Sequence, residues 1–394
     1  MDAIEELLTR GVVNIIPGKA ELVALLRSGK KLNVYLGIDP TATKIHIGHA
    51  VPLRKLQAFA QAGHTVTFLI GDFTALIGDT SDKESERPIL TSAQIEENFQ
   101  TYKKQAQKIL DFSKVKVRHN SEWLKKLGFD EIIKLAYHFS AGDFFSRELI
   151  KKRLTEGTHV GLHEVLYPVM QGYDSYFMDT DIQLGGTDQT FNMQAGRILQ
   201  KDLRGKESFI MANPFLEGTD GRKMSKTWGN AIWLDDMPEE MYGKVMSLKD
   251  DLIIEYFTLA TYTPIGEIAQ VKQALENREN PMLWKKLLAH RIVSELHSSS
   301  LADEAQKQFE LTFQKKDLRQ ATLPTVSVST LTSIASVSQI LIDTKIASSK
   351  SQAKRLLSQG SVTFDESKAI HDIPPITPKS GTIISVGKTH IKLS

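Results

Sequence analysis

The sequence predicts an α/β fold that begins with a parallel sheet covered by helices, continues with a helical region and ends with a small α+β module. Three observations predict this order. Strand-like runs alternate with helical periodicity up to about residue 235, the pattern of a parallel sheet with helices on both faces. From 238 to about 316 the periodicity is only helical, with Pro238, Pro264 and Pro281 each placed to start a helix. Residues 337–394 are basic and mix both patterns.

The predicted strands of the first region are short apolar runs bounded by turn residues. The clearest covers residues 33–38, whose alternation puts Tyr35, Gly37 and Asp39 on one face of the sheet. Further strands are expected at 65–70, 115–118, 181–184 and 208–211, and a long helix at 92–112. Such sheets bind ligands at the carboxyl ends of their strands, so we expect a site among the segments that follow these strands.

Two histidines, His46 and His49, follow the strand at 33–38. We expect the next helix to begin near Gly48, because Pro52 suits only a first turn, where its missing N–H has no partner to lose. The histidines therefore stand at a helix N-terminus, where unpaired backbone donors and the helix dipole favour a phosphate.

The histidine pair could instead bind a metal ion. The chain contains no cysteine, and no third ligand stands at a recognisable spacing, so we expect no metal site. The sequence also lacks the Gly-x4-Gly-Lys-Ser/Thr phosphate loop.

A cationic segment at 223–227, Lys-Met-Ser-Lys-Thr, follows a predicted strand and a loop that contains Gly218 and Gly221. By itself it would be an ordinary solvated loop, but its charge and its glycine-containing surroundings suit closure over phosphates.

A third segment, 167–174, places Tyr167, Gln171 and Asp174 at positions i, i+4 and i+7. They share one face of a helix whose first turn we expect at Pro168. These polar side chains either face water or line a polar pocket, and spacing alone does not decide between the two.

Composition limits the class of protein. The 394 residues, 41% of them hydrophobic, can bury a large core and are expected to form two or three domains. The chain opens without a signal segment, contains no run of about 18 apolar residues and lacks cysteine, so we expect a cytoplasmic protein outside the membrane. The net charge of +2 is uneven, because residues 337–394 carry eight Lys/Arg and four Asp/Glu, as a nucleic-acid-binding appendage would.

Four parts are therefore expected: a catalytic domain at 1–235, a helical domain at 236–320, a linker at 321–336 and a basic module at 337–394. The linker has Ser or Thr at eight of sixteen positions. In the module, Ser349 can cap a helix at 350–359, and strands are expected at 362–364 and 382–386.

The basic residues of that helix, Lys350, Lys354 and Arg355, are expected on its outer face. For a charge run alone, a plain amphipathic surface helix would be the better interpretation. The helix, its stop at Gly360 and the strand that follows together favour RNA binding.

These motifs together resemble those of a known enzyme family. The segments 46–49 and 223–227 resemble the two signatures of class I aminoacyl-tRNA synthetases, and the segments 35–41, 167–174 and 185–189 are similar to the tyrosyl-tRNA synthetases. The basic module resembles an RNA-binding module first described in a ribosomal small-subunit protein. The resemblance extends from about Val34 to the end of the chain. It implies a Rossmann-like catalytic domain, a helical domain that recognises the tRNA anticodon and an α+β RNA-binding domain.

The resemblance also implies a reaction. L-tyrosine would react with ATP to form tyrosyl-adenylate and pyrophosphate, with Mg²⁺ carried by ATP, and the tyrosyl group would then pass to the 3′-terminal adenosine of tRNA(Tyr). It implies a symmetric homodimer, and no metal or organic cofactor held by the protein.

The implied residues fall into two groups. For tyrosine they are Tyr35 and Asp174 at the phenol, Thr74, Asp79, Tyr167 and Gln171 at the ammonium group, and Gln189 beside the carboxylate. At the adenosine portion of ATP they are Gly37, Asp39, Gly186 and Asp188. The catalytic residues contact the phosphates or close over the pyrophosphate. Thr41, His46 and His49 would contact the phosphates, and Lys83, Arg87, Lys223, Lys226 and Thr227 would close over the pyrophosphate.

Three positions depart from the family pattern. Leu36 stands where several members have a cysteine near the ribose, so we expect that contact to be lost. Asp82 adds an acid to a loop that others fill with glycine, which puts the closing geometry of that loop in doubt. The second signature ends in Thr227 rather than serine.

Other classes of function remain open. One is an RNA-binding or splicing cofactor that has lost activity, against which the intact signatures argue. Another is a different nucleotidyltransferase with a similar histidine turn, which the basic module disfavours. A tryptophanyl-tRNA synthetase is the nearest enzymatic alternative, and the acid at Asp174 weighs against it.

Overall fold

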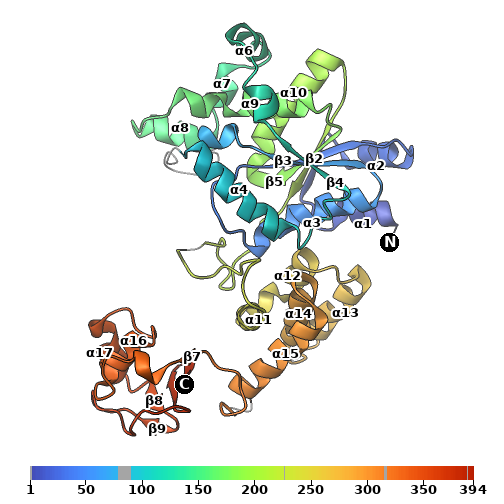
Figure 1. Ribbon diagram of the computed structural model, residues 1–394. Helices are drawn as coiled ribbons and strands as arrows, with labels where there is room; N and C mark the ends of the chain where they lie inside the picture. Colours follow the sequence, from blue (N-terminus) through green and yellow to red (C-terminus); the bar gives the residue numbers. More distant parts are fainter. Residues whose placement is uncertain (1, 79–89, 226, 315–316, 388) are drawn as a thin grey trace. The chain divides into compact units, whose positions relative to one another are not determined.

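The structure is a computed structural model that describes residues 2–78, 90–225, 227–314, 317–387 and 389–394. The chain forms two compact units, Met1–Ala302 and Asp303–Ser394. Figure 1 shows a sheet surrounded by helices in the first unit and a small module of strands and helices in the second.

The first unit is built on a sheet whose described strands run in the order β1-β6-β5-β2-β3-β4. Strands β2 to β6 are parallel to their neighbours, and the edge strand β1 is antiparallel to β6. The predicted parallel sheet is confirmed, with strand ends shifted by no more than two residues, whereas β1 was not predicted. The strands are β1 (Asn14–Ile16), β2 (Asn33–Ile38), β3 (Thr65–Ile70), β4 (Val115–His119), β5 (Ile182–Gly186) and β6 (Phe209–Asn213).

Strand β2 lies at the centre of this sheet and determines where a ligand can bind. The chain builds outward from β2 to β3 and β4 on one side, and then returns to place β5 and β6 on the other side. The order therefore reverses between β2 and β5. A crevice forms at such a reversal, at the carboxyl ends of the strands, because the connections leave in opposite directions.

Helices cover both faces of the sheet and continue beyond it (Figure 1). Those around the sheet are α1 (Ala3–Thr9), α2 (Lys19–Arg27), α3 (Ile47–Gln61), α4 (Ser92–Ala106), α5 (Ser121–Leu124), α6 (Phe129–Ala136), α7 (Ala141–Phe145), α8 (Glu148–Thr155), α9 (Leu162–Phe177) and α10 (Thr190–Arg204). Those that follow are α11 (Pro238–Met246), α12 (Ile253–Ala260), α13 (Ile265–Glu276), α14 (Pro281–Leu296) and α15 (Ser299–Phe309).

Prolines mark helix starts less well than the sequence suggested. Pro238 and Pro281 do begin α11 and α14, and Pro264 caps α13. Pro52 and Pro168, however, lie inside α3 and α9 rather than in their first turns. Within α9, the Glu164 carbonyl loses its usual donor at Pro168 and accepts a hydrogen bond from Arg147 Nη2 at 3.3 Å instead.

Helix α4 is shorter than the predicted helix at 92–112. It ends at Ala106, and the residues that follow form tight turns. Asp111 accepts hydrogen bonds from the backbone N–H and the hydroxyl of Ser113 at 3.0 and 2.6 Å. Such local side-chain bonds compete with helical bonds, so they disfavour helix in the last residues of the predicted range.

The helices from α11 to α14 belong to the first compact unit, although a domain boundary was expected near residue 235. Arg10 explains part of this attachment. Its guanidinium donates to the carbonyls of Thr258, Thr261 and Thr263 at 2.6 to 2.9 Å, at and beyond the C-terminal end of α12. A cation at the C-terminal end of a helix satisfies carbonyls that lack helical partners and favours the helix dipole.

The second unit combines α15 residues from Asp303 onward, a small sheet and two helices. Its strands run in the order β7-β11-β10-β8-β9. They are β7 (Thr325–Val326), β8 (Val362–Phe364), β9 (Ser367–Lys368), β10 (Ile383–Val386) and β11 (Thr389–Leu393), and the helices are α16 (Val337–Asp343) and α17 (Lys350–Ser358). Ser349 caps α17 through a hydrogen bond from the Gln352 N–H, as expected.

The segment expected to be a linker, 321–336, contributes to this sheet. Strand β7 pairs in parallel with β11, and Val326, Val328 and Leu331 pack against the core of the second unit. The partner strand lies more than sixty residues later in the chain, so local composition carries no sign of the pairing. The Ser- and Thr-rich segment therefore does not serve as a free linker along its whole length.

Within the described ranges, no helix combines the length and the apolar character that crossing a bilayer requires.

Candidate active site

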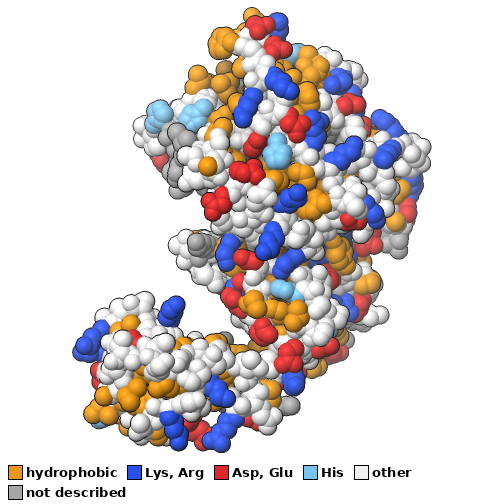
Figure 2. Space-filling model, in the orientation of Figure 1, with side chains coloured by type: hydrophobic (Ala, Val, Ile, Leu, Met, Phe, Trp, Pro, Cys, Tyr) orange, Lys and Arg blue, Asp and Glu red, His pale blue; other side chains and the backbone are white. Residues whose placement is uncertain are grey.

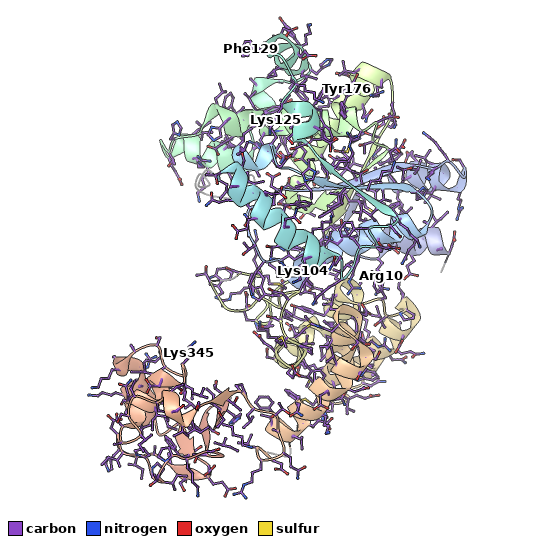
Figure 3. All side chains as sticks on the ribbon, in the orientation of Figure 1. Arg10, Lys104, Lys125, Phe129, Tyr176 and Lys345 are labelled. Carbon is purple, nitrogen blue, oxygen red and sulfur yellow. The ribbon has the colours of Figure 1, made fainter. Side chains whose placement is uncertain are left out.

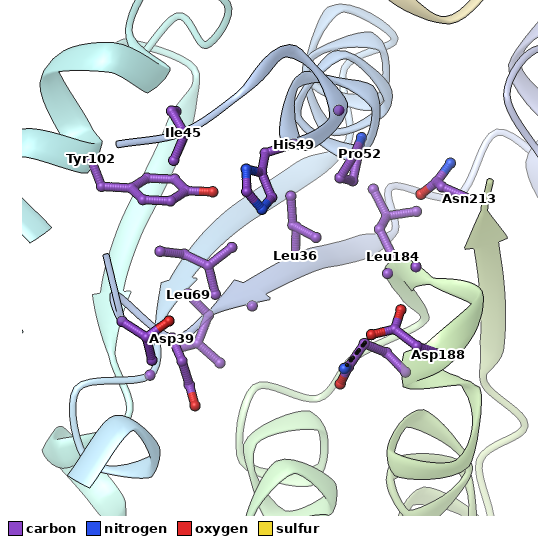
Figure 4. Close-up of a pocket in the computed structure, with 18 of the residues that line it drawn as sticks. Leu36, Asp39, Ile45, His49, Pro52, Leu69, Tyr102, Leu184, Asp188 and Asn213 are labelled. Atoms are coloured by element: carbon purple, nitrogen blue, oxygen red, sulfur yellow. Dashed lines mark hydrogen bonds between the residues drawn. The ribbon is translucent and has the colours of Figure 1, made fainter. Parts of the chain in front are cut away.

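A cavity of about 350 Å³ opens at the carboxyl ends of β2 and β5, where the strand order reverses (Figure 4). It brings together most of the residues that the sequence singled out, from segments far apart in the chain. Those lining it are Tyr35, Gly37, Asp39, Thr41, His46, His49, Thr74, Tyr167, Gln171, Asp174, Gly186, Asp188, Gln189 and Lys223.

Among the described residues, one expected member is missing from the lining of this cavity. Thr227 is exposed and does not line it. Asp79, Asp82, Lys83, Arg87 and Lys226 lie outside the described residues. Leu36 does line the cavity and presents an apolar side chain there.

One end of the cavity holds a buried acid. Asp174 on α9 is 3% exposed, and its two carboxylate oxygens accept hydrogen bonds from Trp123 Nε1 at 2.7 Å and Asn120 Nδ2 at 3.1 Å. Burial raises the pKa of Asp174 to about 8, against the opposing effect of these two donors. The carboxyl group is therefore costly to ionise and is held in one orientation.

A buried phenol lies near this acid. Tyr35 on β2 donates to Gln183 Oε1 on β5 at 3.1 Å, because the parallel register places these two residues side by side. Burial, and secondarily the charge of Asp174, raises the pKa of Tyr35, so its hydroxyl keeps its proton. Tyr35 and Asp174 thus form a polar contact point in an otherwise apolar end of the cavity.

A hydrogen-bonded chain leads from this acid to a second one. Asn120 Nδ2 also donates to Thr74 Oγ1 at 3.0 Å, and Thr74 donates to Asp39 Oδ1 at 2.8 Å. Asp39 Oδ2 accepts from the Tyr167 hydroxyl at 2.9 Å. The carboxylate of Asp39 therefore lies between Thr74 and Tyr167. Both of these residues were expected at the ammonium group, whereas Asp39 was expected beside the adenosine. Gly71 allows this approach, since a Cβ there would lie 2.0 Å from Asp39 Oδ1.

The two histidines stand at the other end, at the start of α3. Their rings stack with centroids 3.8 Å apart, and the His46 backbone N–H donates to His49 Nδ1 at 3.3 Å. Because Nδ1 of His49 accepts this bond, its Nε2 carries the proton in the neutral ring. Gly48 keeps the turn compact, since a Cβ there would lie 2.9 Å from His46 Nδ1.

Both histidines are neutral at physiological pH. Burial lowers the pKa of His46 to about 3, helped by His49 and Lys223, and lowers the pKa of His49 to about 4. His49 is an exposed residue that lines the cavity, so a ligand there can reach its ring. Histidine therefore offers N–H donors at this end, and Lys223 supplies positive charge.

Asn230, which sequence reasoning missed, holds Lys223 and Ser225 of the cationic segment. Asn230 Oδ1 accepts from the Ser225 N–H at 2.8 Å, and its Nδ2 donates to the Lys223 carbonyl at 3.2 Å and to Asp220 at 2.8 Å. Lys223 extends its ammonium group over the Phe215 ring, 5.5 Å from the centroid, at the edge of the cavity.

Asn120, Trp123 and Gln183 were also missed. Asn120 and Trp123 follow β4, so the rule that ligands bind at strand carboxyl ends could have identified them. Gln183 lies within a predicted strand, and only the register with Tyr35 reveals its role.

The second unit carries the expected basic residues. Lys350, Lys354 and Arg355 are exposed on α17, whereas Ala353 and Leu357 are buried on its other face. Figure 2 shows Lys and Arg side chains projecting from this unit.

In the part of the chain that the structure describes, no three His, Asp or Glu side chains lie close enough together to hold a metal ion.

The sequence is similar to known proteins along most of its length. Residues 27–314 match the family described as tRNA synthetases class I (W and Y). The chain is 42% identical to tyrosine–tRNA ligase 2 of Vibrio vulnificus over 381 residues, covering 96% of this chain and 95% of that protein. It is also 42% identical to the tyrosine–tRNA ligase of Thermotoga maritima over 386 residues, covering 97% and 95%.

Solved structures share the fold. A C-terminally truncated mitochondrial tyrosyl-tRNA synthetase of Aspergillus nidulans aligns with a TM-score of 0.67 at 23% identity, covering 79% of this chain and 94% of that one. A tyrosyl-tRNA synthetase of Archaeoglobus fulgidus in complex with L-tyrosine aligns with a TM-score of 0.61 at 22% identity, covering 78% and 100%. With the near full-length sequence relatives, and with His46, His49 and Lys223 of the two signatures lining one cavity, the chain belongs to the class I tRNA synthetases of the W and Y type, among the tyrosine–tRNA ligases.

Proposed function

We propose that this chain activates L-tyrosine with ATP and transfers the tyrosyl group from tyrosyl-adenylate to the 3′-terminal adenosine of tRNA(Tyr). The observation that carries the proposal is the cavity at the strand reversal. It joins a buried acid and phenol at one end to two neutral histidines and Lys223 at the other. The 42% identity to tyrosine–tRNA ligases supports the same substrates.

The phenol end would recognise the substrate hydroxyl. An oxygen of Asp174 can accept a hydrogen bond from the phenol of tyrosine, because each oxygen has a second acceptor site beyond its bond to Trp123 or Asn120. Tyr35 lies close enough to Asp174 for its pKa to respond to that charge, so both groups can meet the same hydroxyl. Phenylalanine would leave these buried groups unpaired.

The middle of the cavity would hold the amino acid's charged groups. Asp39 and Tyr167 are joined by a hydrogen bond, and with Thr74 and Gln171 they present a negative and polar wall that suits the ammonium group. Gln189, which donates to Asp188 at 3.0 Å, would lie beside the carboxylate. We also assign Asp79 to the ammonium group by resemblance.

The adenosine portion of ATP would lie against Gly37, Gly186 and Asp188, with Asp39 nearby. Leu36 offers no polar contact to the ribose.

The chemical step needs positioned donors more than proton transfer. The tyrosine carboxylate attacks the α-phosphorus of ATP, the bond to pyrophosphate breaks, and an ionised carboxylate needs no general base. MgATP is the substrate. Thr41, the histidine N–H groups and the α3 N-terminus would donate to phosphate oxygens, and Lys223, Lys226, Thr227, Lys83 and Arg87 would close over the pyrophosphate.

The second unit would bind tRNA. Its residues 337–394 carry a net charge of +4, and three of the basic residues share the exposed face of α17. Positive side chains on one helix attract the phosphate backbone without requiring base contacts. By resemblance, we assign recognition of the anticodon to the helices at 236–320. The product serves translation, so we place the enzyme in the cytoplasm.

We also propose a homodimer. Large apolar side chains are exposed on neighbouring helices of the first unit, with Phe129 and Tyr137 of α6 79% and 85% exposed and Leu162 of α9 69% exposed. Ile133, Phe145 and Leu154 on α6, α7 and α8 are exposed as well. Figure 3 shows Phe129 at the outer end of α6. Exposed apolar surface on this scale is typical of an interface between protein chains.

Activation can be tested by ATP–pyrophosphate exchange with each of the twenty amino acids. Tyrosine is expected to support exchange, and exchange with tryptophan alone, or with none, would refute the proposal.

His49→Ala should lower the rate of adenylate formation about 10²- to 10³-fold with little change in tyrosine affinity, because its N–H stabilises charge that develops in the transition state. His371→Ala, an exposed histidine of the second unit, should match the parent.

Asp174→Asn is expected to change both specificity and stability. It should lower the tyrosine-to-phenylalanine ratio of kcat/KM, because the amide replaces one of the two acceptor oxygens with an N–H donor. The folded pKa of about 8 exceeds the unfolded value, so the free energy of unfolding of the parent should fall as pH rises from about 4 to 8, by up to about 1.4 kcal/mol per pH unit from this group. The variant should lack that fall. Equal pH dependence in chemical denaturation of the two proteins would contradict the assignment.

Charge reversal on α17 separates the two half-reactions. Lys350→Glu, Lys354→Glu and Arg355→Glu together should leave tyrosine activation intact and reduce tRNA charging by about tenfold or more, because repulsion replaces attraction to phosphates. A matched control that keeps the charge, with Lys350→Arg, Lys354→Arg and Arg355→Lys, should charge tRNA nearly as well as the parent. Removal of residues 323–394 should act like the reversal. Unchanged charging by the reversed protein would exclude α17 as an RNA contact.

The dimer can be tested by sedimentation. The parent should sediment at about twice the 44.1 kDa of one chain, whereas Phe129→Glu with Tyr137→Glu should sediment as a monomer. Ile373→Glu, at an equally exposed apolar residue of the second unit, serves as the control and should remain dimeric. A double variant that still dimerises would place the interface elsewhere.

A further inference from the structure

Helix α4 carries a stripe of three buried polar side chains on one face. Asn98, Tyr102 and Gln105 stand at positions i, i+4 and i+7, so they share one face of the helix. All three are buried, with 9%, 6% and 4% of their surfaces exposed. Buried polar side chains of this kind are retained where they have partners.

Two members of the stripe hold the loop between β2 and α3. Asn98 Nδ2 donates to the Pro40 carbonyl at 2.9 Å. Gln105 Nε2 donates to the Thr43 carbonyl at 2.8 Å, and Gln105 Oε1 accepts from the Ile45 N–H at 3.0 Å. The loop that leads into His46 is thus attached to α4 at three backbone groups.

The third member, Tyr102, faces the cavity. Its ring lies near Phe68 of β3, with centroids 6.1 Å apart, and it lines the same cavity as the histidines. Figure 4 shows its hydroxyl directed into the cavity toward His49. Among the residues that the structure describes, this hydroxyl has no hydrogen-bond partner, although the side chain is more than nine-tenths buried. Burial raises the pKa of Tyr102, so the hydroxyl remains a donor.

We propose that Tyr102 contacts ATP, donating its hydroxyl proton to a triphosphate oxygen alongside Nε2–H of His49, while Asn98 and Gln105 position both groups. The inference rests on the proposed function for the identity of the nucleotide. The hydroxyl is directed toward His49, which we place at the phosphates, so its partner is a phosphate rather than the amino acid's side chain. A phosphate oxygen is a strong acceptor and satisfies a donor that the protein leaves without one.

Tyr102→Phe tests the contact because it removes only the hydroxyl and keeps the ring against Phe68. The variant should lower kcat/KM for ATP in tyrosine-dependent pyrophosphate exchange about 10- to 100-fold, as expected for a lost hydrogen bond to a charged group. Its KM for tyrosine and its melting temperature should match the parent's. The dissociation constant for ATP, measured without tyrosine, should rise.

Two further variants separate the hydroxyl from the ring. Tyr242→Phe removes a hydroxyl from an equally buried ring on α11, outside the cavity, and should retain parental exchange. Tyr102→Leu removes the ring as well. If the hydroxyl makes the contact, its kcat/KM for ATP should be only slightly lower than that of Tyr102→Phe. If Tyr102→Phe stays within about twofold of the parent in both exchange and ATP binding, the inference is overturned, even if only Tyr102→Leu is impaired.

The ATP measurement also distinguishes this inference from the proposed function. A parent protein that binds ATP more tightly than Tyr102→Phe, yet shows no tyrosine-dependent exchange, would support the contact and refute the tyrosine reaction. Normal tyrosine exchange in both proteins would support the reaction and refute the contact.

Discussion

The side chain of Asn120 is the constraint on which the substrate end of this site depends. Its Nδ2 donates to Asp174 and to Thr74, and its Oδ1 accepts from the Phe73 N–H at 2.9 Å. One fully buried amide therefore joins the carboxyl ends of β3 and β4 to α9. Because such a network loses most of its value when one member is unpaired, the positions of both acids follow from this residue and from the parallel register that brings the strands together.

The electrostatics of the cavity follow a simple division. The acids Asp39, Asp174 and Asp188 line the cavity, and burial makes ionisation of Asp174 costly. The histidines lie stacked at the start of α3, and burial lowers their pKa values and so favours their neutral, donating forms, while Lys223 supplies the positive charge. An arrangement of this kind orients a ligand that is positive at one end and strongly negative at the other.

The sequence predicted the sheet well, because most strands from β2 to β6 are local apolar runs, and β4 (Val-Lys-Val-Arg-His) alternates apolar and basic residues at its start. It predicted helix starts less well, since Pro168 is accommodated by Arg147, a residue far from it in the chain. The pairing of β7 with β11 is equally non-local. The motif residues at 46–49 and 167–174 were recognisable by their pattern, but Asn120, Gln183 and Asn230 are ordinary polar residues without a spacing signature. The strand-end rule could have pointed to Asn120, whereas only their hydrogen-bond partners reveal what Gln183 and Asn230 do.

The loop that contains Lys223 differs in one respect from an ordinary surface loop. Asn230 bonds to the backbone of Lys223 and Ser225 and to Asp220, and it packs so closely on Gly218 that a Cβ there would lie 2.4 Å from its amide nitrogen. The segment is thereby cross-braced by a single side chain. Closing a segment braced in this way over a ligand would freeze fewer dihedrals than closing a loop whose residues move independently, so the entropy lost on closure would be correspondingly small.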